Sequence, residues 1–101
     1  MPQTVIESVC FKLNKSASRE DFTAAAREVS QWVKTRPGFV QRRLSCAEDG
    51  TWTDHIEWES MDAAREAAGA IGSAPETARF LAAIDGETVQ LTHSELILRL
   101  D

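Results

Sequence analysis

Ionisable and aromatic side chains gather in one short alternating segment, Asp54-His55-Ile56-Glu57-Trp58, and recur in two other segments that carry Glu7 and His93. Histidine gains and loses a proton near neutral pH, and a carboxylate can act as a base beside it. The indole of Trp58 offers a flat face on which an aromatic or quinone-like ring can stack. These residue types are compatible with the abstraction of a phenolic proton, with His93 or His55 as the base.

The same residues have structural interpretations that the sequence leaves open. His93 and His55, the only histidines, could each be hydrogen-bonded strand residues without a catalytic role. Trp58 could pack in the core of a dimer rather than against a ligand. Residue type is compatible with either outcome, since position and partners decide the role.

A third group of charged residues, Glu7, Arg43 and Asp54, could meet across neighbouring strands. This group predicts either an ion network or a clamp on the substrate. A metal site is not expected, because it needs several converging ligands and consecutive strand positions such as Asp54 and His55 point to opposite faces. No phosphate-binding loop, dinucleotide-binding motif or nucleophile elbow occurs, and we expect no cofactor.

The bulk composition argues against several classes of function. A chain of 101 residues has room for a single domain, spanning residues 1–101. Its formal charge of −5 and the lack of a basic stripe argue against nucleic-acid binding. No segment has the pattern of a signal peptide or of a membrane span, so no membrane association is expected. Cys10 and Cys46 would lie two strand spacings apart, too far for a disulfide, and suit a reducing, cytoplasmic location.

Alternation of apolar and polar residues predicts four strands, at residues 4–13, 39–47, 51–59 and 88–98. Helical spacing predicts one helix between the N-cap Ser18 and the stop at Pro37-Gly38, and a second over 61–71 after the N-cap Ser60. A further helical segment is expected over 76–84, ended by Asp85-Gly86. This βαββαβ order predicts the α+β class and the ferredoxin-like fold. Right-handed crossovers then give a four-stranded antiparallel sheet in the order 4-1-3-2, with both helices on one face and the other face bare.

The chain resembles the antibiotic-biosynthesis-monooxygenase-like (ABM) domains of the dimeric α/β-barrel superfamily. The matching segments are the strand Val5–Leu13, Arg36-Pro37-Gly38-Phe39-Val40, and Ile56-Glu57-Trp58-Glu59-Ser60 before the second helix. A helix interrupted at Pro75 and a last strand after Asp85 also fit. The resemblance implies a homodimer in which two sheets face each other as a barrel. It also implies a cavity in each half for a small apolar or aromatic molecule.

Strand alternation divides the sheet side chains into two faces. The expected first face carries Val5, Glu7, Val9, Phe11, Gln41, Arg43, Trp52, Asp54, Ile56, Trp58, Leu91, His93 and Glu95. The expected second face carries Ile6, Ser8, Cys10, Arg42, Leu44, Thr53, His55, Glu57, Thr92 and Ser94. Composition alone would place the first, more apolar face beneath the helices. The resemblance favours the first face as the cavity and the second beneath the helices, and a bulge in the third strand would then bring His55 to the cavity.

The resemblance implies a cofactor-independent monooxygenase acting on a small aromatic or polyketide-like substrate. His93 or Glu7 would form the phenolate, Trp58 and Phe11 would orient the ring, and Arg43 would steady the developing oxyanion. Asp54 and His55 are expected to contact the substrate as well.

Two other functions remain as alternatives. A non-enzymatic dimeric module that binds or senses a small molecule would use the same pocket. Haem degradation is disfavoured, because superfamily members with that activity carry a histidine ligand on the second helix and an asparagine on the first strand. Here residues 74–84 contain no histidine and the first strand contains no asparagine.

Overall fold

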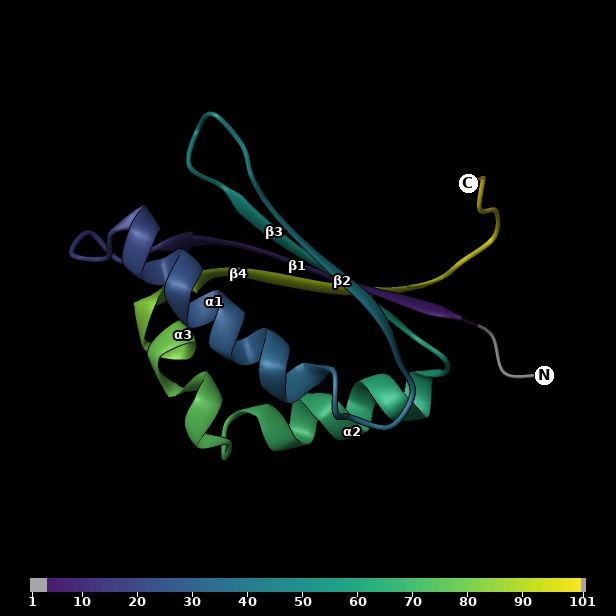
Figure 1. Cartoon of the computed structure of the whole chain (residues 1–101). Helices are drawn as coiled ribbons and strands as arrows, with labels where there is room; N and C mark the ends of the chain where they lie inside the picture. Colours follow the sequence, from purple (N-terminus) through teal and green to yellow (C-terminus); the bar gives the residue numbers. More distant parts are fainter. Residues whose placement is uncertain (1–3, 101) are drawn as a thin grey trace.

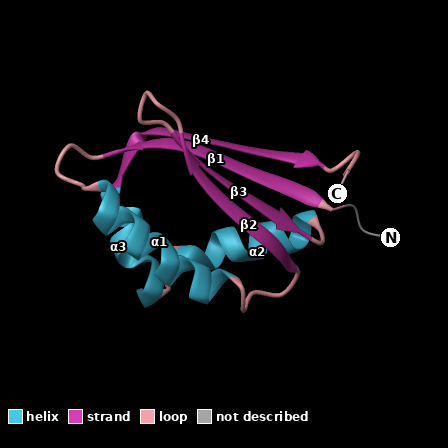
Figure 2. Cartoon of the chain, turned by 45° about the horizontal axis from the view of Figure 1, so that its top comes forward, coloured by secondary structure: helices cyan, strands magenta, loops and turns pink. Residues whose placement is uncertain are grey.

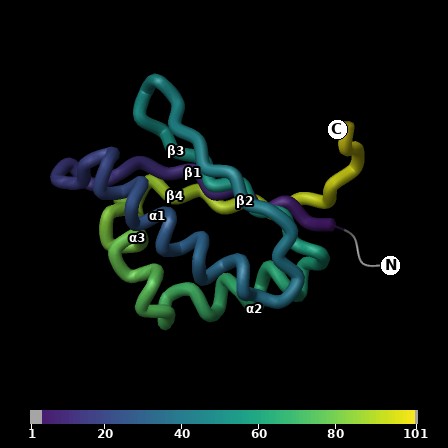
Figure 3. Tube along the Cα trace, in the orientation of Figure 1, coloured from purple at the N-terminus to yellow at the C-terminus, as the bar shows by residue number. Residues whose placement is uncertain are grey.

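All the predicted strands and helices form, and a computed structural model of the protein, which describes residues 4–100, gives their bounds (Figure 1). In chain order they are β1 (Val5–Leu13), α1 (Arg19–Val33), β2 (Phe39–Cys46), β3 (Trp52–Trp58), α2 (Met61–Ile71), the 3-10 turn η1 (Pro75–Thr77), α3 (Ala78–Ala83) and β4 (Ile84–Glu95). The sheet is antiparallel with the order β2-β3-β1-β4, which confirms the predicted order. The first and last strands are neighbours, as the purple and yellow segments of Figure 3 show.

The last strand is longer at its start than predicted. We expected Asp85-Gly86 to separate a helix from a strand that begins at Thr88, yet β4 begins at Ile84. Asp85 pairs with Lys12, and the register then shifts between Lys12 and Cys10. The Asp-Gly pair therefore marks an irregularity within a strand, where glycine is well tolerated, rather than the end of an element.

Both long helices begin at the predicted serine caps. The hydroxyl oxygen of Ser18 accepts a hydrogen bond from the backbone N–H of Asp21 at 3.0 Å, and that of Ser60 accepts one from Ala63 at 3.1 Å. Each bond satisfies a backbone donor that has no partner within the helix. Helix α1 buries one stripe against the sheet, formed by Phe22, Ala25, Ala26, Val29, Trp32 and Val33.

Gly38 explains why the segments 36–40 and 56–60, both of which carry the family resemblance, lie against each other. Its φ is +82°, and a Cβ at this position would lie 2.6 Å from the Cβ of Ala63 in α2. Its carbonyl oxygen accepts a hydrogen bond from the backbone N–H of Glu59 at 2.8 Å. The glycine thus lets the start of β2 lie directly against the β3–α2 junction, which only a residue without a side chain permits.

The β2–β3 turn is closed by local hydrogen bonds. Gly50 has a φ of +88°. The backbone N–H of Thr51 donates to the Asp49 carboxylate at 2.9 Å. Hydrogen bonds from the backbone and then the side chain of Thr51 lower the pKa of the Asp49 carboxyl from its ordinary value of 3.8.

The helices lie together on one side of the sheet, as predicted, but on the face opposite to the one we favoured (Figure 2). Phe11 and Trp52 pack in one buried cluster with α1 and Phe80, and Ile56 and Trp58 pack in another with α1 and α2. The first face is therefore beneath the helices, as composition alone indicated. Trp52, beside the β2–β3 turn, is buried for the same reason.

A bulge in β2 changes which of its side chains share that face. Phe39 pairs with Trp58 and Gln41 pairs with Glu57, so Val40 is the extra residue. After the bulge, Arg42 shares a face with Ile56, and Arg43 with His55. Our expectation that Arg43 and Gln41 lie beside Asp54, with Arg42 and Leu44 opposite, is wrong. No bulge interrupts the β1–β3 pairing from Val5–Trp58 to Phe11–Trp52, so His55 and Glu57 stay on the outer face.

Candidate functional site

A cavity of about 410 Å³ lies between the sheet and the helices. Its walls come from the two inner strands, β4 and all three helices, and members of both buried clusters line it. The lining residues are Glu7, Val9, Phe11, Val29, Trp32, Val33, Asp54, Ile56, Trp58, Ala67, Ala68, Ile71, Phe80, Leu81, Ile84, Gly86, Val89 and Leu91. This size and predominantly apolar lining are typical of a site for a small organic molecule.

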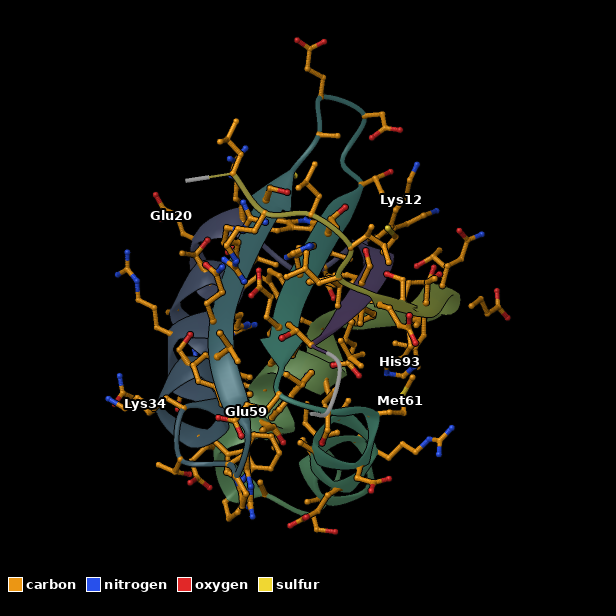
Figure 4. The ribbon with its side chains drawn as sticks, turned by 90° about the vertical axis from the view of Figure 1, so that its right-hand side faces the viewer. Lys12, Glu20, Lys34, Glu59, Met61 and His93 are labelled. Carbon is orange, nitrogen blue, oxygen red and sulfur yellow. The ribbon has the colours of Figure 1, made fainter. Side chains whose placement is uncertain are left out.

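Glu7 and His93 lie on one face of the sheet, as strand parity indicated, and the structure brings their side chains into contact. They are directly opposite in the β1–β4 pairing, and His93 Nε2 lies 2.9 Å from Glu7 Oε2. The Glu7 side chain is 10% exposed and lines the cavity, while that of His93 is 22% exposed. Figure 4 shows His93 on the β4 side of the sheet, with Lys12, Glu20 and Lys34 at the periphery. Glu7 is the member of this pair that lines the cavity, and His93 contacts it through the hydrogen bond.

Trp58 and Phe11 supply aromatic walls to the cavity. Both are 1% exposed, so their rings lie in the interior. Phe11 meets Phe22 and Phe80 edge to face, and Trp58 meets Phe39 in the same way.

The indole Nε1 of Trp58 is buried and has no hydrogen-bond partner among residues 4–100. A buried N–H without an acceptor costs about 1–3 kcal/mol. Trp58 is also among the residues that line the cavity.

Asp54 lines the cavity with its charge already paired. Arg42 donates from Nε to Oδ1 at 2.9 Å and from Nη2 to Oδ2 at 2.8 Å, and the two side chains are 6% and 7% exposed. Arg42 Nη1 also donates to the carbonyl oxygen of Ala26 and to the hydroxyl of Ser30. Both carboxylate oxygens are therefore engaged, which makes Asp54 a fixed part of the wall rather than a free base.

Arg43 and His55 do not line this cavity. Arg43 Nη2 lies 3.3 Å from His55 Nδ1 on the outer face of the sheet. There they border a hollow with Gln41, Glu57 and the C-terminal residues 96, 98, 99 and 100. Of the predicted site residues, the structure brings Glu7, His93, Trp58, Phe11 and Asp54 together and leaves Arg43 and His55 on the other side.

Two cavity-related residues were not anticipated. Trp32 lines the cavity from α1, and its position three residues after Val29 on the helical stripe could have indicated this. Arg42, which holds Asp54, is placed by the β2 bulge, and the sequence of that strand contains neither glycine nor proline to signal one.

Within the part of the chain that the structure describes, no group of three or more His, Cys, Asp or Glu residues is placed to hold a metal ion. No helix over the same residues is long and apolar enough to cross a membrane. Cys10 and Cys46 are both free thiols.

The chain is thus an α+β protein of ferredoxin-like topology with a cavity between sheet and helices. Solved structures of ABM-like proteins share this fold over nearly the whole chain, which confirms the resemblance at the level of the fold. Neither a comparison with protein-family models nor a search among curated proteins gave a match.

Three of these structures show the range of activities built on the fold. SnoaB, a cofactor-independent oxygenase from Streptomyces nogalater, is 18% identical with a TM-score of 0.70, over 98% of this chain and 96% of that one. The ActVA-Orf6 monooxygenase of Streptomyces coelicolor, in complex with nanaomycin D, is 20% identical with a TM-score of 0.72, over 97% and 91%. The haem-degrading protein Rv3592 of Mycobacterium tuberculosis is 19% identical with a TM-score of 0.69, over 100% and 99%. At these identities the likeness establishes the fold and not the activity.

Proposed function

We propose that this protein is an ABM-like, cofactor-independent oxygenase that acts on a small aromatic or polyketide-like molecule in the cavity between sheet and helices. The observation that carries the proposal is the Glu7–His93 dyad at the wall of an otherwise apolar, aromatic-lined cavity. The activities of SnoaB and the ActVA-Orf6 enzyme support it, because both are oxygenases on the same fold.

Each wall of the cavity has a role in this proposal. The Glu7–His93 dyad takes the proton of a ring hydroxyl and so makes the ring electron-rich. Trp58 donates its indole N–H to a ring oxygen, and Phe11 contacts the ring itself. Arg43, on the outer face, takes no part in stabilising the oxyanion.

The reaction requires no electron donor besides the substrate. The phenolate carbon forms a bond with dioxygen, and the oxygen–oxygen bond then breaks. One oxygen atom stays on the ring as a carbonyl and the other leaves as water, so the phenol is oxidised to a quinone while dioxygen is reduced. The dyad takes up the hydroxyl proton and returns it to the peroxide oxygen. The C–H bond at the attacked carbon then breaks as the carbonyl forms, and its proton joins the departing hydroxide, so that water receives both protons.

Haem is a poor fit to the cavity. An axial ligand to haem iron is commonly histidine, cysteine, methionine or tyrosine, and none of these residues is among those that line the cavity.

A homodimer through the outer face of the sheet is part of the proposal. That face carries no helix, and the segment beyond β4 exposes Ile97, Leu98 and Leu100 at 85%, 84% and 95%. Exposed apolar side chains in one short segment favour a protein partner, and a second copy would cover them. Native mass spectrometry is expected to give twice the chain mass, and a monomer at micromolar concentration would refute the dimer.

A panel of hydroxynaphthalenes and quinols tests the activity, with oxygen uptake and product mass as readouts. In ¹⁸O₂ the quinone product should gain one labelled atom. The variants Glu7→Gln and His93→Asn should lower kcat by about a hundredfold or more, as expected for loss of a general base. His55→Asn is the matched control, since His55 is the other histidine and lies outside the cavity.

The outcomes separate the alternatives. Equal turnover in His93→Asn and His55→Asn would refute the role of the dyad. Tight binding of a panel member without turnover would instead identify a binding or sensing module.

A further inference from the structure

The charged groups that line the cavity are all acidic. Only Glu7 and Asp54 carry charge among its lining residues, and no lysine or arginine is among them. The neutral polar group of note is the Trp58 indole N–H, which is buried and lacks an acceptor within residues 4–100. The lining therefore carries two carboxylates, no cationic side chain and otherwise mostly apolar surface.

Arg42, which pairs with Asp54, does not offer its positive charge to a ligand in the cavity. Arg42 makes four hydrogen bonds within the protein, to Asp54, Ala26 and Ser30. Its guanidinium carbon lies 5.4 Å from the ring centre of Phe80, which itself lines the cavity. Arg42 neutralises Asp54, and it borders a separate hollow between α1 and β2 together with two arginines of α1, Arg19 and Arg27.

Glu7 is thus the carboxylate without a permanent counter-charge at the cavity wall. Its hydrogen-bonded partner is His93, and an imidazole, unlike a guanidinium, is not a permanent cation. A ligand anion would lose its hydration in an apolar site and would meet Glu7 rather than a cation. Two like charges about 8 Å apart, at an effective dielectric constant of about 20, repel enough to weaken binding about thirtyfold.

We propose that this cavity selects against acidic ligands and takes ring compounds that are uncharged or carry an amine. A hydroxyl or ammonium group donates to Glu7, and a ring oxygen accepts from Trp58. This inference rests on the proposed function, since it names the substrate class of the same cavity.

Three sterically matched probes test the selection by titration calorimetry at pH 7.5: naphthylmethanol, naphthylmethylamine and naphthoate. The neutral and cationic probes should bind at least about tenfold more tightly than naphthoate. Glu7→Gln should reduce the ratio of the naphthoate Kd to the naphthylmethanol Kd several-fold, because naphthoate would bind more tightly. Glu28→Gln is the matched control, because it removes the same charge from the exposed face of α1. This variant should leave the ratio of the two dissociation constants unchanged.

The failures of the two proposals are distinguishable. If naphthoate bound the unaltered protein as tightly as naphthylmethanol does, the charge selection would be overturned. The assignment of the cavity as a ligand site would then still stand. An equal response to Glu7→Gln and Glu28→Gln would overturn the assignment to Glu7, since net charge alone would then account for the effect. Binding of none of the three probes would overturn the ligand cavity, and with it the proposed function.

Discussion

Removing the charge of Asp54 should destabilise this protein far more than removing a surface charge. The Arg42–Asp54 pair has two hydrogen bonds of 2.9 and 2.8 Å, and both side chains are more than nine-tenths buried. In Asp54→Asn the amide cannot accept from both donors, and the guanidinium is left buried without its counter-charge. Breaking a buried ion pair in this way costs about 3–5 kcal/mol.

An exposed pair in the same molecule provides the control. Arg79 and Glu28 are 2.7 Å apart, as close as the buried pair, but their side chains are 62% and 45% exposed. Water screens this pair, so Glu28→Gln should cost less than about 1 kcal/mol. The two variants differ in burial and hardly at all in the distance between the charges.

Urea denaturation and thermal melting measure both effects. For a chain near 100 residues, each kcal/mol corresponds to a Tm change of about 4–8 °C, so Asp54→Asn should lower Tm by at least about 12 °C. The double variant Arg42→Met/Asp54→Leu should recover most of the loss, because apolar side chains can replace a buried pair without residual charge. Equal losses in Asp54→Asn and Glu28→Gln, or a double variant that loses the sum of the two single losses, would refute the buried pair.

Three further predictions concern single positions, each read by one measurement. Gly38→Ala should lower the free energy of unfolding, measured by urea denaturation, by at least about 1 kcal/mol more than Gly50→Ala. Both glycines have positive φ, but only at Gly38 would a Cβ lie against another side chain. Equal losses in the two variants would refute the close packing at Gly38. Gly86→Trp should weaken naphthyl binding while Gly72→Trp does not, since both positions have open space for a side chain but only Gly86 lines the cavity; unchanged affinity in both would contradict the assigned lining. Titration by NMR should give the Asp49 carboxyl a pKa below 3.8, because hydrogen bonds in the turn lower it. The contribution of this carboxylate to stability is therefore present above pH 3.8 and is lost as the pH falls through the pKa of the folded state. A titration midpoint at or above 3.8 would count against those hydrogen bonds.

The element order and the caps could be predicted because their signals are local. Ser18 and Ser60 are each followed by a helical pattern of small and apolar residues, and Gly50 lies between two alternating segments. Strand parity also placed Glu7 and His93 on one face. Their direct pairing depends on the β1–β4 register between residues 86 apart in sequence, and no local pattern specifies it.

The side of the sheet taken by each arginine could not be predicted for a different reason. One extra residue, Val40, exchanges the faces of Arg42 and Arg43, because side chains alternate with a period of two. A bulge at a valine has no compositional marker, whereas a glycine would have indicated one. The same limitation applies to the Asp85-Gly86 pair, whose composition is that of a turn although the residues lie within β4.

The partners of the two cavity carboxylates decide which of them can act as a base. Asp54 faces an arginine, a permanent cation whose two hydrogen bonds occupy both carboxylate oxygens. Glu7 faces a histidine, a residue type that serves as a general acid or base, so we assign the transfer of the substrate proton to this pair. Asp54→Asn should therefore affect stability more than turnover in the protein that remains folded, and Glu7→Gln should affect turnover more than stability. If Asp54→Asn abolished turnover with stability intact, the assignment of the base to Glu7 and His93 would be wrong.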